Sequence, residues 1–189
     1  INQLGFSYIT YPSAEHSRFI HSIGMANVVD RFVQAINRDH QEDGVEFAPG
    51  VKGYASFKDL KPLKESEIIH AALLHDVGHL PFSHVAEAAI VSSPSFFRFG
   101  SLPYSEFVGK AELHLGKKIS LSEARSILVV LSDRFGRYYR QHIIQREDDD
   151  ALLRIACLIA GQRVQEKCPN IQHIISSSAV DADKIDYVT

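Results

Sequence analysis

Two adjacent residues that can bind a metal, His75 and Asp76, follow directly on an apolar segment that contains Ala71 and Ala72. An imidazole and a carboxylate are both strong ligands for a divalent cation. Adjacent residues can share one ion only where the backbone turns sharply, and Gly78 provides a break in the helix at this point. Because a buried carboxylate is costly unless it is paired or coordinated, the pair predicts a divalent-metal site.

Two other segments contain residues that can complete such a site. His21 continues a helical stripe with Met25 and Val28, so it is expected to face inward. Arg18 lies one turn earlier on the same face, where a guanidinium suits a phosphate beside a metal. Asp183, within a run of three aspartates, offers a further oxygen ligand. A site of two imidazoles and two carboxylates suits Mn, Fe, Zn, Ni or Mg, and ligand type does not choose among them.

The elements that must position these residues are helices, because three- and four-residue hydrophobic spacing dominates the chain. Predicted helices cover residues 17–36, 66–76, 81–91, 105–115 and 121–146, followed by one that ends near 161 and one that begins near 180. Ser66 can cap the second helix, Gly78 ends it, and Pro81 can start the third. The run from Ser120 to Glu123 has the pattern of a capping box. The predicted fold class is all-α.

The regions between the helices predict loops, over residues 39–62 with a short hairpin near 51–54, and over 92–103. No strand ladder is expected. We expect residues 1–189 to form a single domain. Because the chain starts at Ile1 without a methionine and stops inside a predicted helix, we also expect it to be an excerpt of a longer protein.

Composition limits the expected partners. The chain has 189 residues, 45% apolar, and a net charge of −3, with a pI near 6.4, so it has a core but no general attraction to polyanions. Its basic residues lack the aromatic-interleaved pattern of a nucleic-acid site, and no apolar run approaches the roughly 18–20 residues of a membrane span. Cys157 and Cys168 have no zinc-ribbon spacing and fit reduced thiols. We expect a cytoplasmic protein that binds neither nucleic acid nor membrane.

The order His21, then His75 and Asp76, then Asp183 resembles the H…HD…D signature of the HD-domain metal-dependent phosphohydrolases. The resemblance implies an HD-domain helical bundle around a single divalent metal ion. In it, these four residues would be the metal ligands.

The residues around each ligand narrow the resemblance further. Residues 11–24 (YPSAEHSRFIHSIG), 75–84 (HDVGHLPFSH) and 181–187 (DADKIDY) are similar to the three motifs of the deoxynucleoside triphosphate triphosphohydrolase branch, which includes the SAM-and-HD-domain proteins. This similarity implies hydrolysis of a deoxynucleoside triphosphate to a deoxynucleoside and tripolyphosphate. It also implies a homo-oligomer with a nucleotide substrate as its partner.

The same resemblance implies residues that bind the substrate. Arg18, Lys184 and Tyr187 match residues that contact the phosphates. Gln3 and Leu4 match positions that touch the nucleoside.

Three residues are candidates for catalysis. His79 and His84 match histidines that line the phosphate site, and Glu87 matches an acidic residue one turn after the second of them. His84 and Glu87, three residues apart on a helix, can form an imidazole–carboxylate pair. We expect His84, oriented by Glu87, to transfer a proton, with His79 beside it.

One position departs from the pattern of this branch, and three functions stay open. Members of the branch place a catalytic histidine and a glutamate near the start of the next helix, where this chain has Ser105 and Glu106. Besides a triphosphohydrolase, the chain could be a nucleotide monophosphatase or phosphodiesterase on the same fold, or a non-catalytic module that senses a nucleotide. The cyclic-dinucleotide phosphodiesterases are disfavoured, because His79 stands where they have a lysine.

Overall fold

The computed structural model describes residues 2, 7–11, 16–39, 65–93, 98–116, 118–145, 150–162, 174–175 and 182–188. The predicted loop over residues 39–62, with its hairpin, lies outside the described residues except for residue 39. Helices dominate the described residues, which confirms the all-α class. None of these helices is long and apolar enough to cross a membrane.

The elements follow one another along the chain, with a short 3-10 helix first. They are η1 Ser7–Ile9, α1 Arg18–Asp39, α2 Glu65–Leu74, α3 Ser83–Ser92, β1 Arg98–Phe99, β2 Leu102–Pro103, α4 Tyr104–Leu115, α5 Leu121–Val130, α6 Asp133–Tyr138, the π-helical η3 Tyr139–Ile144, α7 Ala151–Ile159 and α8 Ala182–Val188. The strands β1 and β2 form a two-residue antiparallel ladder inside the loop predicted over 92–103, where no strand was expected.

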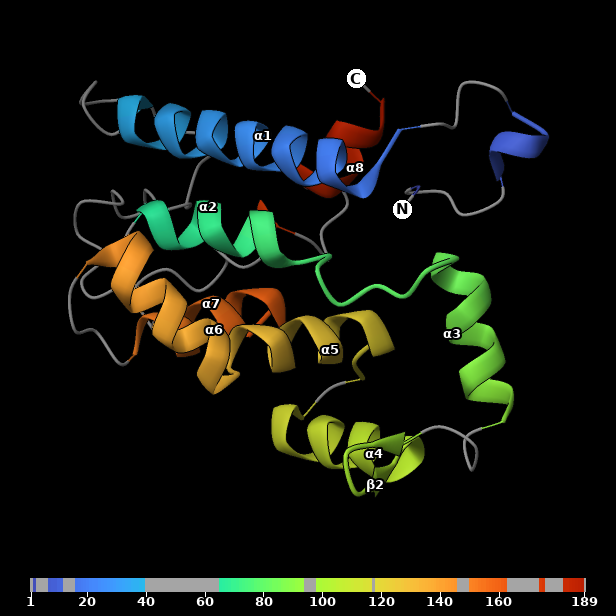
Figure 1. Cartoon of the computed structure of the whole chain (residues 1–189). Coiled ribbons are helices and arrows are strands. Elements are labelled where there is room, and N and C mark those ends of the chain that lie inside the picture. The colour runs from blue at the N-terminus through green and yellow to red at the C-terminus, as the bar shows by residue number, and fades with distance from the viewer. Residues whose placement is uncertain are drawn as a thin grey trace, which may run out of the picture.

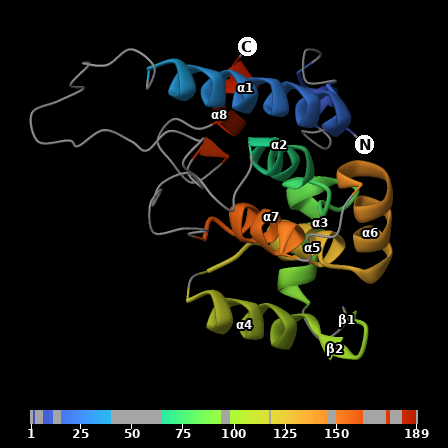
Figure 2. The same ribbon diagram turned by 90° about the vertical axis from the view of Figure 1, so that its left-hand side faces the viewer.

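The helices are stacked in layers (Figures 1 and 2). Helix α1 and the short α8 form one outer layer, α2 lies beneath them, α5, α6 and α7 follow, and α4 lies on the far side. Helix α3 stands at one end of the stack (Figure 1). Helix α2 packs against both α1 and α7, and α1 packs against α8, although α1 and α8 are far apart in the sequence.

The core explains why His21 faces inward. On α1, Met25, Val29 and Val33 recur at four-residue steps, and each is at most 1% exposed. His21 continues that row one turn earlier and is 1% exposed. Val28, expected in the stripe, is partly buried and packs at its edge. The site histidine is therefore placed by the same periodicity that builds the core.

Helix α2 ends earlier than the predicted span of 66–76. It stops at Leu74, and residues 75–78 form a turn. In a continued helix the amide of Gly78 would bond the carbonyl of Leu74. Instead it donates to the hydroxyl of Ser126, which in turn donates to the carbonyl of His75. The adjacent residues His75 and Asp76 therefore lie in the turn and not at the end of the helix.

The predicted helix over 121–146 is divided into three segments, α5, α6 and η3. Ser132 makes the first break. Its hydroxyl donates to the carbonyl of Val129 at 2.8 Å and accepts the amide of Phe135 at 3.3 Å, so it caps a new helix.

Two other helix starts differ in how well local sequence predicts them. The capping box is confirmed, with Ser120 and Glu123 exchanging side-chain to backbone hydrogen bonds. Helix α3 begins at Ser83, two residues after Pro81, because Phe82 has a left-handed backbone with φ 68° and cannot be helical.

A buried ion pair joins α2 to α7. Arg154 donates to both carboxylate oxygens of Glu67 at 2.8 Å, and the two residues are 8% and 1% exposed. One turn along α2, Nδ1 of His70 lies 2.7 Å from the hydroxyl of Tyr139. Burial lowers the pKa of His70, although the charge of Glu67 opposes this shift. These polar contacts fix the helix that leads into the turn with His75 and Asp76.

Candidate metal centre

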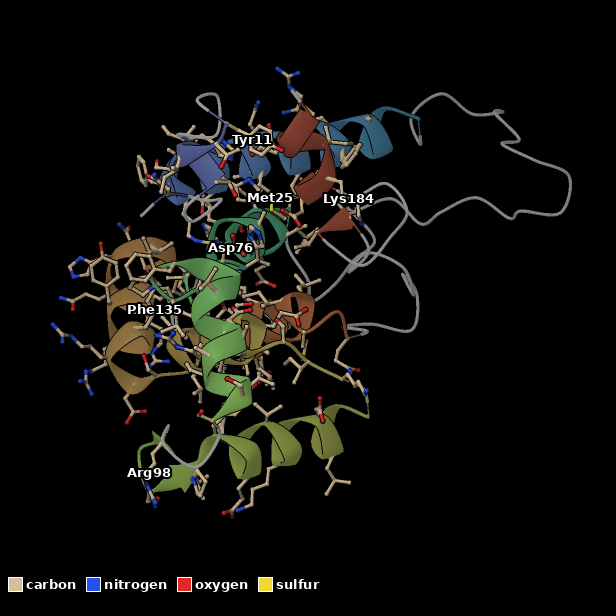
Figure 3. All side chains as sticks on the ribbon, turned by 90° about the vertical axis from the view of Figure 1, so that its right-hand side faces the viewer. Tyr11, Met25, Asp76, Arg98, Phe135 and Lys184 are labelled. Carbon is tan, nitrogen blue, oxygen red and sulfur yellow. The ribbon has the colours of Figure 1, made fainter. Side chains whose placement is uncertain are left out.

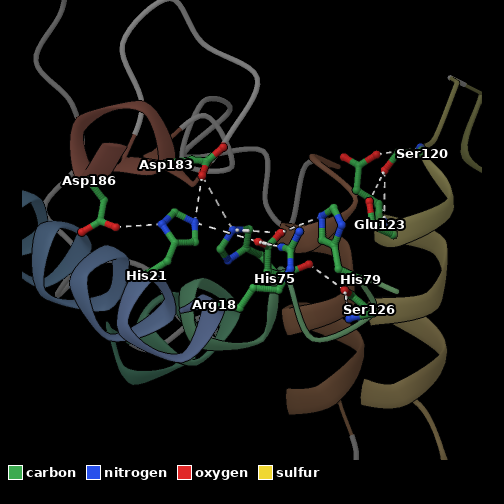
Figure 4. A network of polar contacts seen from close by, with 12 residues as sticks. Arg18, His21, His75, His79, Ser120, Glu123, Ser126, Asp183 and Asp186 are labelled. Carbon is green, nitrogen blue, oxygen red and sulfur yellow. Dashed lines mark hydrogen bonds and ion pairs between the residues drawn. The ribbon is translucent and has the colours of Figure 1, made fainter. Parts of the chain in front are cut away.

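His21 is held by a carboxylate on one nitrogen and faces the centre with the other (Figure 4). Its Nδ1 lies 2.7 Å from Oδ2 of Asp186. Because a carboxylate accepts, this contact favours the proton on Nδ1 and leaves the lone pair on Nε2. Nε2 lies 3.1 Å from Oδ1 of Asp183 and 3.9 Å from Oδ2 of Asp76.

His75 is arranged in the same way by its own backbone. Its Nδ1 donates to the carbonyl of Ala72 at 2.7 Å, so Nε2 has the lone pair. That Nε2 is buried and makes no hydrogen bond among the described residues. It lies 3.3 Å from Oδ1 of Asp76 and 3.9 Å from Oδ1 of Asp183. A buried nitrogen lone pair that faces carboxylates is poorly satisfied by them and well satisfied by a cation.

The donor atoms converge on one point. One ligand atom from each of His21, His75 and Asp76 lies within 4.8 Å of the others. Oδ1 of Asp183 lies close to both imidazole Nε2 atoms. This set of nitrogen and oxygen donors fits a divalent cation of the kind that mixed N/O sites bind. The structure thus brings His21, His75 and Asp76 together and places Asp183 beside both imidazoles.

Asp186, which the sequence did not single out, supports this arrangement. Its close approach to α1 depends on Gly24, since a Cβ at that position would lie 1.9 Å from Oδ1 of Asp186. The spacing of Asp183 and Asp186, three residues apart on α8, was the available signal, because such residues share a helix face. Its partner, His21, could be found only from the fold.

The charges around the centre have a direct effect on its first histidine. Burial alone would lower the pKa of His21, but the nearby carboxylates of Asp183, Asp186 and Asp76 outweigh burial and raise it. Arg18 lies at the other side, with Nη1 2.6 Å from Oδ2 of Asp76. The arginine predicted to bind phosphate therefore adjoins a candidate metal ligand.

His79 links the centre to Glu87 on α3. Its Nε2 lies 3.1 Å from Oδ1 of Asp76 and its Nδ1 lies 3.3 Å from Oε1 of Glu87. The charge of Glu87 also affects the pKa values of Tyr104 and Arg125. Burial and that charge raise the pKa of Tyr104, and burial lowers the pKa of Arg125 while Glu87 opposes the change. His79 thus lies between two carboxylates, one of them a candidate metal ligand.

Glu87 has a described partner, His79, that helical spacing did not predict. The side chain of His84 lies outside the described residues, so its pairing with Glu87 stays a prediction. His79 precedes α3 in irregular backbone. Helical spacing therefore had no means of pairing it with Glu87.

The residues expected to bind substrate are only partly described. Lys184 is exposed on α8, next to a candidate ligand, and Figure 3 shows it on the α8 side of Asp76. Gln3 and Leu4 lie outside the described residues, as does the side chain of Tyr187.

The chain is similar to a protein family and to several known proteins. The family described as "HD domain" matches residues 18–159. The uncharacterized protein MG461 of Mycoplasma genitalium is 24% identical over the whole chain. A protein of Dictyostelium discoideum named deoxynucleoside triphosphate triphosphohydrolase SAMHD1 homolog is 23% identical, again over the whole chain. The chain spans 34% and 29% of the length of these two relatives.

A solved structure shows the same fold. The crystal structure of a hypothetical protein from Aquifex aeolicus superposes on all of this chain and on 36% of its own, with a TM-score of 0.56 at 21% identity.

Proposed function

This chain belongs to the HD domain family, and from that premise we propose that it is a metal-dependent phosphohydrolase acting on nucleotides. The proposed substrate is a deoxynucleoside triphosphate, split to a deoxynucleoside and tripolyphosphate. The observation that carries the proposal is the convergence of the Nε2 atoms of His21 and His75 on the carboxylates of Asp76 and Asp183. The name of the Dictyostelium relative supports the choice of substrate.

In this proposal His21, His75, Asp76 and Asp183 hold one divalent ion. When bound, such an ion polarises a phosphoryl oxygen and lowers the pKa of a water ligand. The protein contributes the fixed orientation of the donors. Asp186 on one histidine and a backbone carbonyl on the other keep both Nε2 lone pairs directed at the centre.

The remaining residues act on the substrate phosphates. Arg18 and Lys184 would neutralise charge on the transferring group, and Tyr187 would contact the same phosphates. Gln3 and Leu4 would touch the nucleoside.

Proton transfer is proposed for the histidines on the far side of Asp76. His79, with Glu87 3.3 Å from Nδ1, would give a proton to a leaving oxygen, and His84 is the second candidate. Glu87 would stabilise the protonated imidazole and hold its ring.

A nucleotide-sensing module without catalysis is the second candidate function. Ser105 and Glu106 stand where the triphosphohydrolase branch has a catalytic histidine and a glutamate. Glu106 forms an exposed ion pair with Lys110, 2.7 Å away on α4. Helix α4 lies on the opposite side of the stack from α1 and α8 (Figure 2).

The test is a nucleotide panel with Mn2+, in which ion-exchange chromatography separates the phosphate products. Tripolyphosphate supports the proposal, and orthophosphate or diphosphate favours a phosphatase or phosphodiesterase. Nucleotide-dependent thermal stabilisation without product favours the sensing module. His21→Ala and Asp76→Ala should each lose bound metal and turnover, whereas His142→Ala, at an exposed residue of η3, should keep both. Full metal content and activity in both site variants would refute the assignment.

A further inference from the structure

Ser126, on α5, bonds the backbone of the metal-binding turn at two points. Its hydroxyl donates to the carbonyl of His75 at 2.6 Å and accepts the amide of Gly78 at 2.9 Å. The residue is completely buried. Its hydroxyl uses its donor and one acceptor position on the same four-residue turn.

These two bonds replace the helical ones. Continued as an α-helix, the chain would pair the amide of Gly78 with the carbonyl of Leu74 and the amide of His79 with the carbonyl of His75. The structure instead pairs the amide of His79 with the carbonyl of Asp76 at 3.1 Å. The amide of Gly78 and the carbonyl of His75 lose their helical partners through this change, and the hydroxyl of Ser126 bonds both of them.

The replacement matters because of the direction of two side chains. Adjacent residues on an α-helix point about 100° apart, at 3.6 residues per turn. In the turn, Nε2 of His75 and Oδ1 of Asp76 come to 3.3 Å. The two neighbours therefore face one centre only because the helix stops at Leu74.

The turn packs so closely against the backbone of α5 that a side chain at Gly78 has no space. A Cβ on Gly78 would lie 2.2 Å from the amide nitrogen of Ser126 and 2.4 Å from the carbonyl oxygen of Ser122. Both are backbone atoms, so they cannot move aside as a flexible side chain would. Glycine is thus required for the hydroxyl to reach the turn.

We propose that Ser126 is a positioning residue for the metal centre: its hydroxyl fixes the turn that points His75 and Asp76 at the same ion. The inference rests on the proposed metal site. It makes metal affinity depend on a residue of α5 that does not itself touch the ion.

Two measurements on Ser126→Ala test it, with Ser122→Ala as the matched control. Ser122 is a buried serine one turn earlier on α5, and its hydroxyl contacts Ser120 at 3.1 Å instead of the turn. Hydrogen exchange monitored by NMR should show faster exchange at the Gly78 amide in Ser126→Ala only. The dissociation constant for Mn2+ should rise by about ten- to a hundredfold in Ser126→Ala and stay near that of the unmodified protein in Ser122→Ala.

The outcomes separate the two proposals. Mn2+ affinity unchanged in Ser126→Ala, beside an unmodified protein that binds Mn2+, overturns the role of the serine and leaves the metal site intact. An equal loss of affinity in Ser122→Ala also overturns it, because the effect would then follow from lost packing in α5. Failure of the unmodified protein to bind Mn2+ overturns the metal site itself.

Discussion

Oδ2 of Asp186 lies 2.7 Å from Nδ1 of His21, so a carboxylate on α8 holds an imidazole on α1 across 165 positions of sequence. The contact joins the first long helix of the chain to its last described helix. It also orients the imidazole of His21, which is 1% exposed, so that Nε2 faces the centre. Metal affinity should therefore depend on a residue that does not itself face the ion.

The first prediction concerns that carboxylate. Asp186→Asn keeps the size of the side chain and an acceptor oxygen but removes the charge, so the imidazole becomes less basic and less firmly oriented. We expect the dissociation constant for Mn2+ to rise by about ten- to a hundredfold. The control is Asp30→Asn, nine residues further along α1, where the carboxylate accepts a hydrogen bond from Gln34 instead. Equal affinities for all three proteins in a Mn2+ titration would contradict the role of Asp186.

The second prediction concerns the close approach of the two helices. In Gly24→Ala the new Cβ would lie 1.9 Å from Oδ1 of Asp186 and 2.8 Å from its Cγ, so the carboxylate must leave His21. We expect weaker Mn2+ binding than in the unmodified protein. Gly109→Ala on α4 is the control, because a Cβ there meets nothing within 4 Å. It should leave metal binding unchanged and raise the free energy of unfolding by about 0.5–1 kcal/mol. If Gly24→Ala bound Mn2+ normally and gained the same stability, the packing argument would be wrong.

Local sequence predicted the features of this fold that depend on local interactions. The row of buried residues on α1 follows from hydrophobic periodicity, and the capping box at Ser120 follows from two side chains three residues apart. The end of α2 was misplaced by two residues because its determinant, Ser126, is far along the chain. A serine on another helix leaves no trace in the periodicity of α2.

The candidate site divides in the same way. His21, His75, Asp76 and Asp183 were suggested by residue type and by resemblance to known motifs. The partners that orient them were not, because Asp186 and Ser126 act through tertiary contacts. Residue chemistry identifies which side chains can bind a metal, whereas the atoms that fix their direction emerge only from the fold.

The third prediction concerns the buried ion pair between α2 and α7. Arg154→Met removes the guanidinium and leaves the carboxylate of Glu67, which is 1% exposed, without its cation. We expect the free energy of unfolding to fall by about 3–5 kcal/mol. Lys110→Met is the control, since its pair with Glu106 is exposed at 63% and 48%, and such pairs contribute about 0–1 kcal/mol. Chemical denaturation measures both.

A double variant distinguishes the loss of the ion pair from the cost of leaving a buried carboxylate without its cation. Replacing both partners, by Glu67→Leu with Arg154→Met, removes the uncompensated charge and should recover much of the lost stability. A double variant that is less stable than Arg154→Met alone would contradict this account, because the lone carboxylate would then not be the source of the loss.

The last prediction is a pH dependence of stability that comes from His70. Burial lowers the pKa of this imidazole below 6.5, against the opposing charge of Glu67. Between the lowered folded pKa and 6.5 the unfolded chain binds more protons than the folded one. The contribution of His70 to stability is therefore complete above pH 6.5 and is lost as the pH falls below it. In His70→Gln the free energy of unfolding should decline less steeply from pH 7 to pH 5 than in the unmodified protein.

The comparison is made as a difference between the two proteins because the pKa of His21 is shifted in the opposite direction. Its raised pKa stabilises the folded state below pH 6.5, and that contribution is lost as the pH rises through the folded value. His21 is present in both proteins, so its contribution cancels in the difference. Parallel stability curves from urea denaturation between pH 5 and pH 7 would show that burial of His70 has no energetic consequence, whereas curves that converge toward pH 5 follow from an imidazole that the fold keeps neutral.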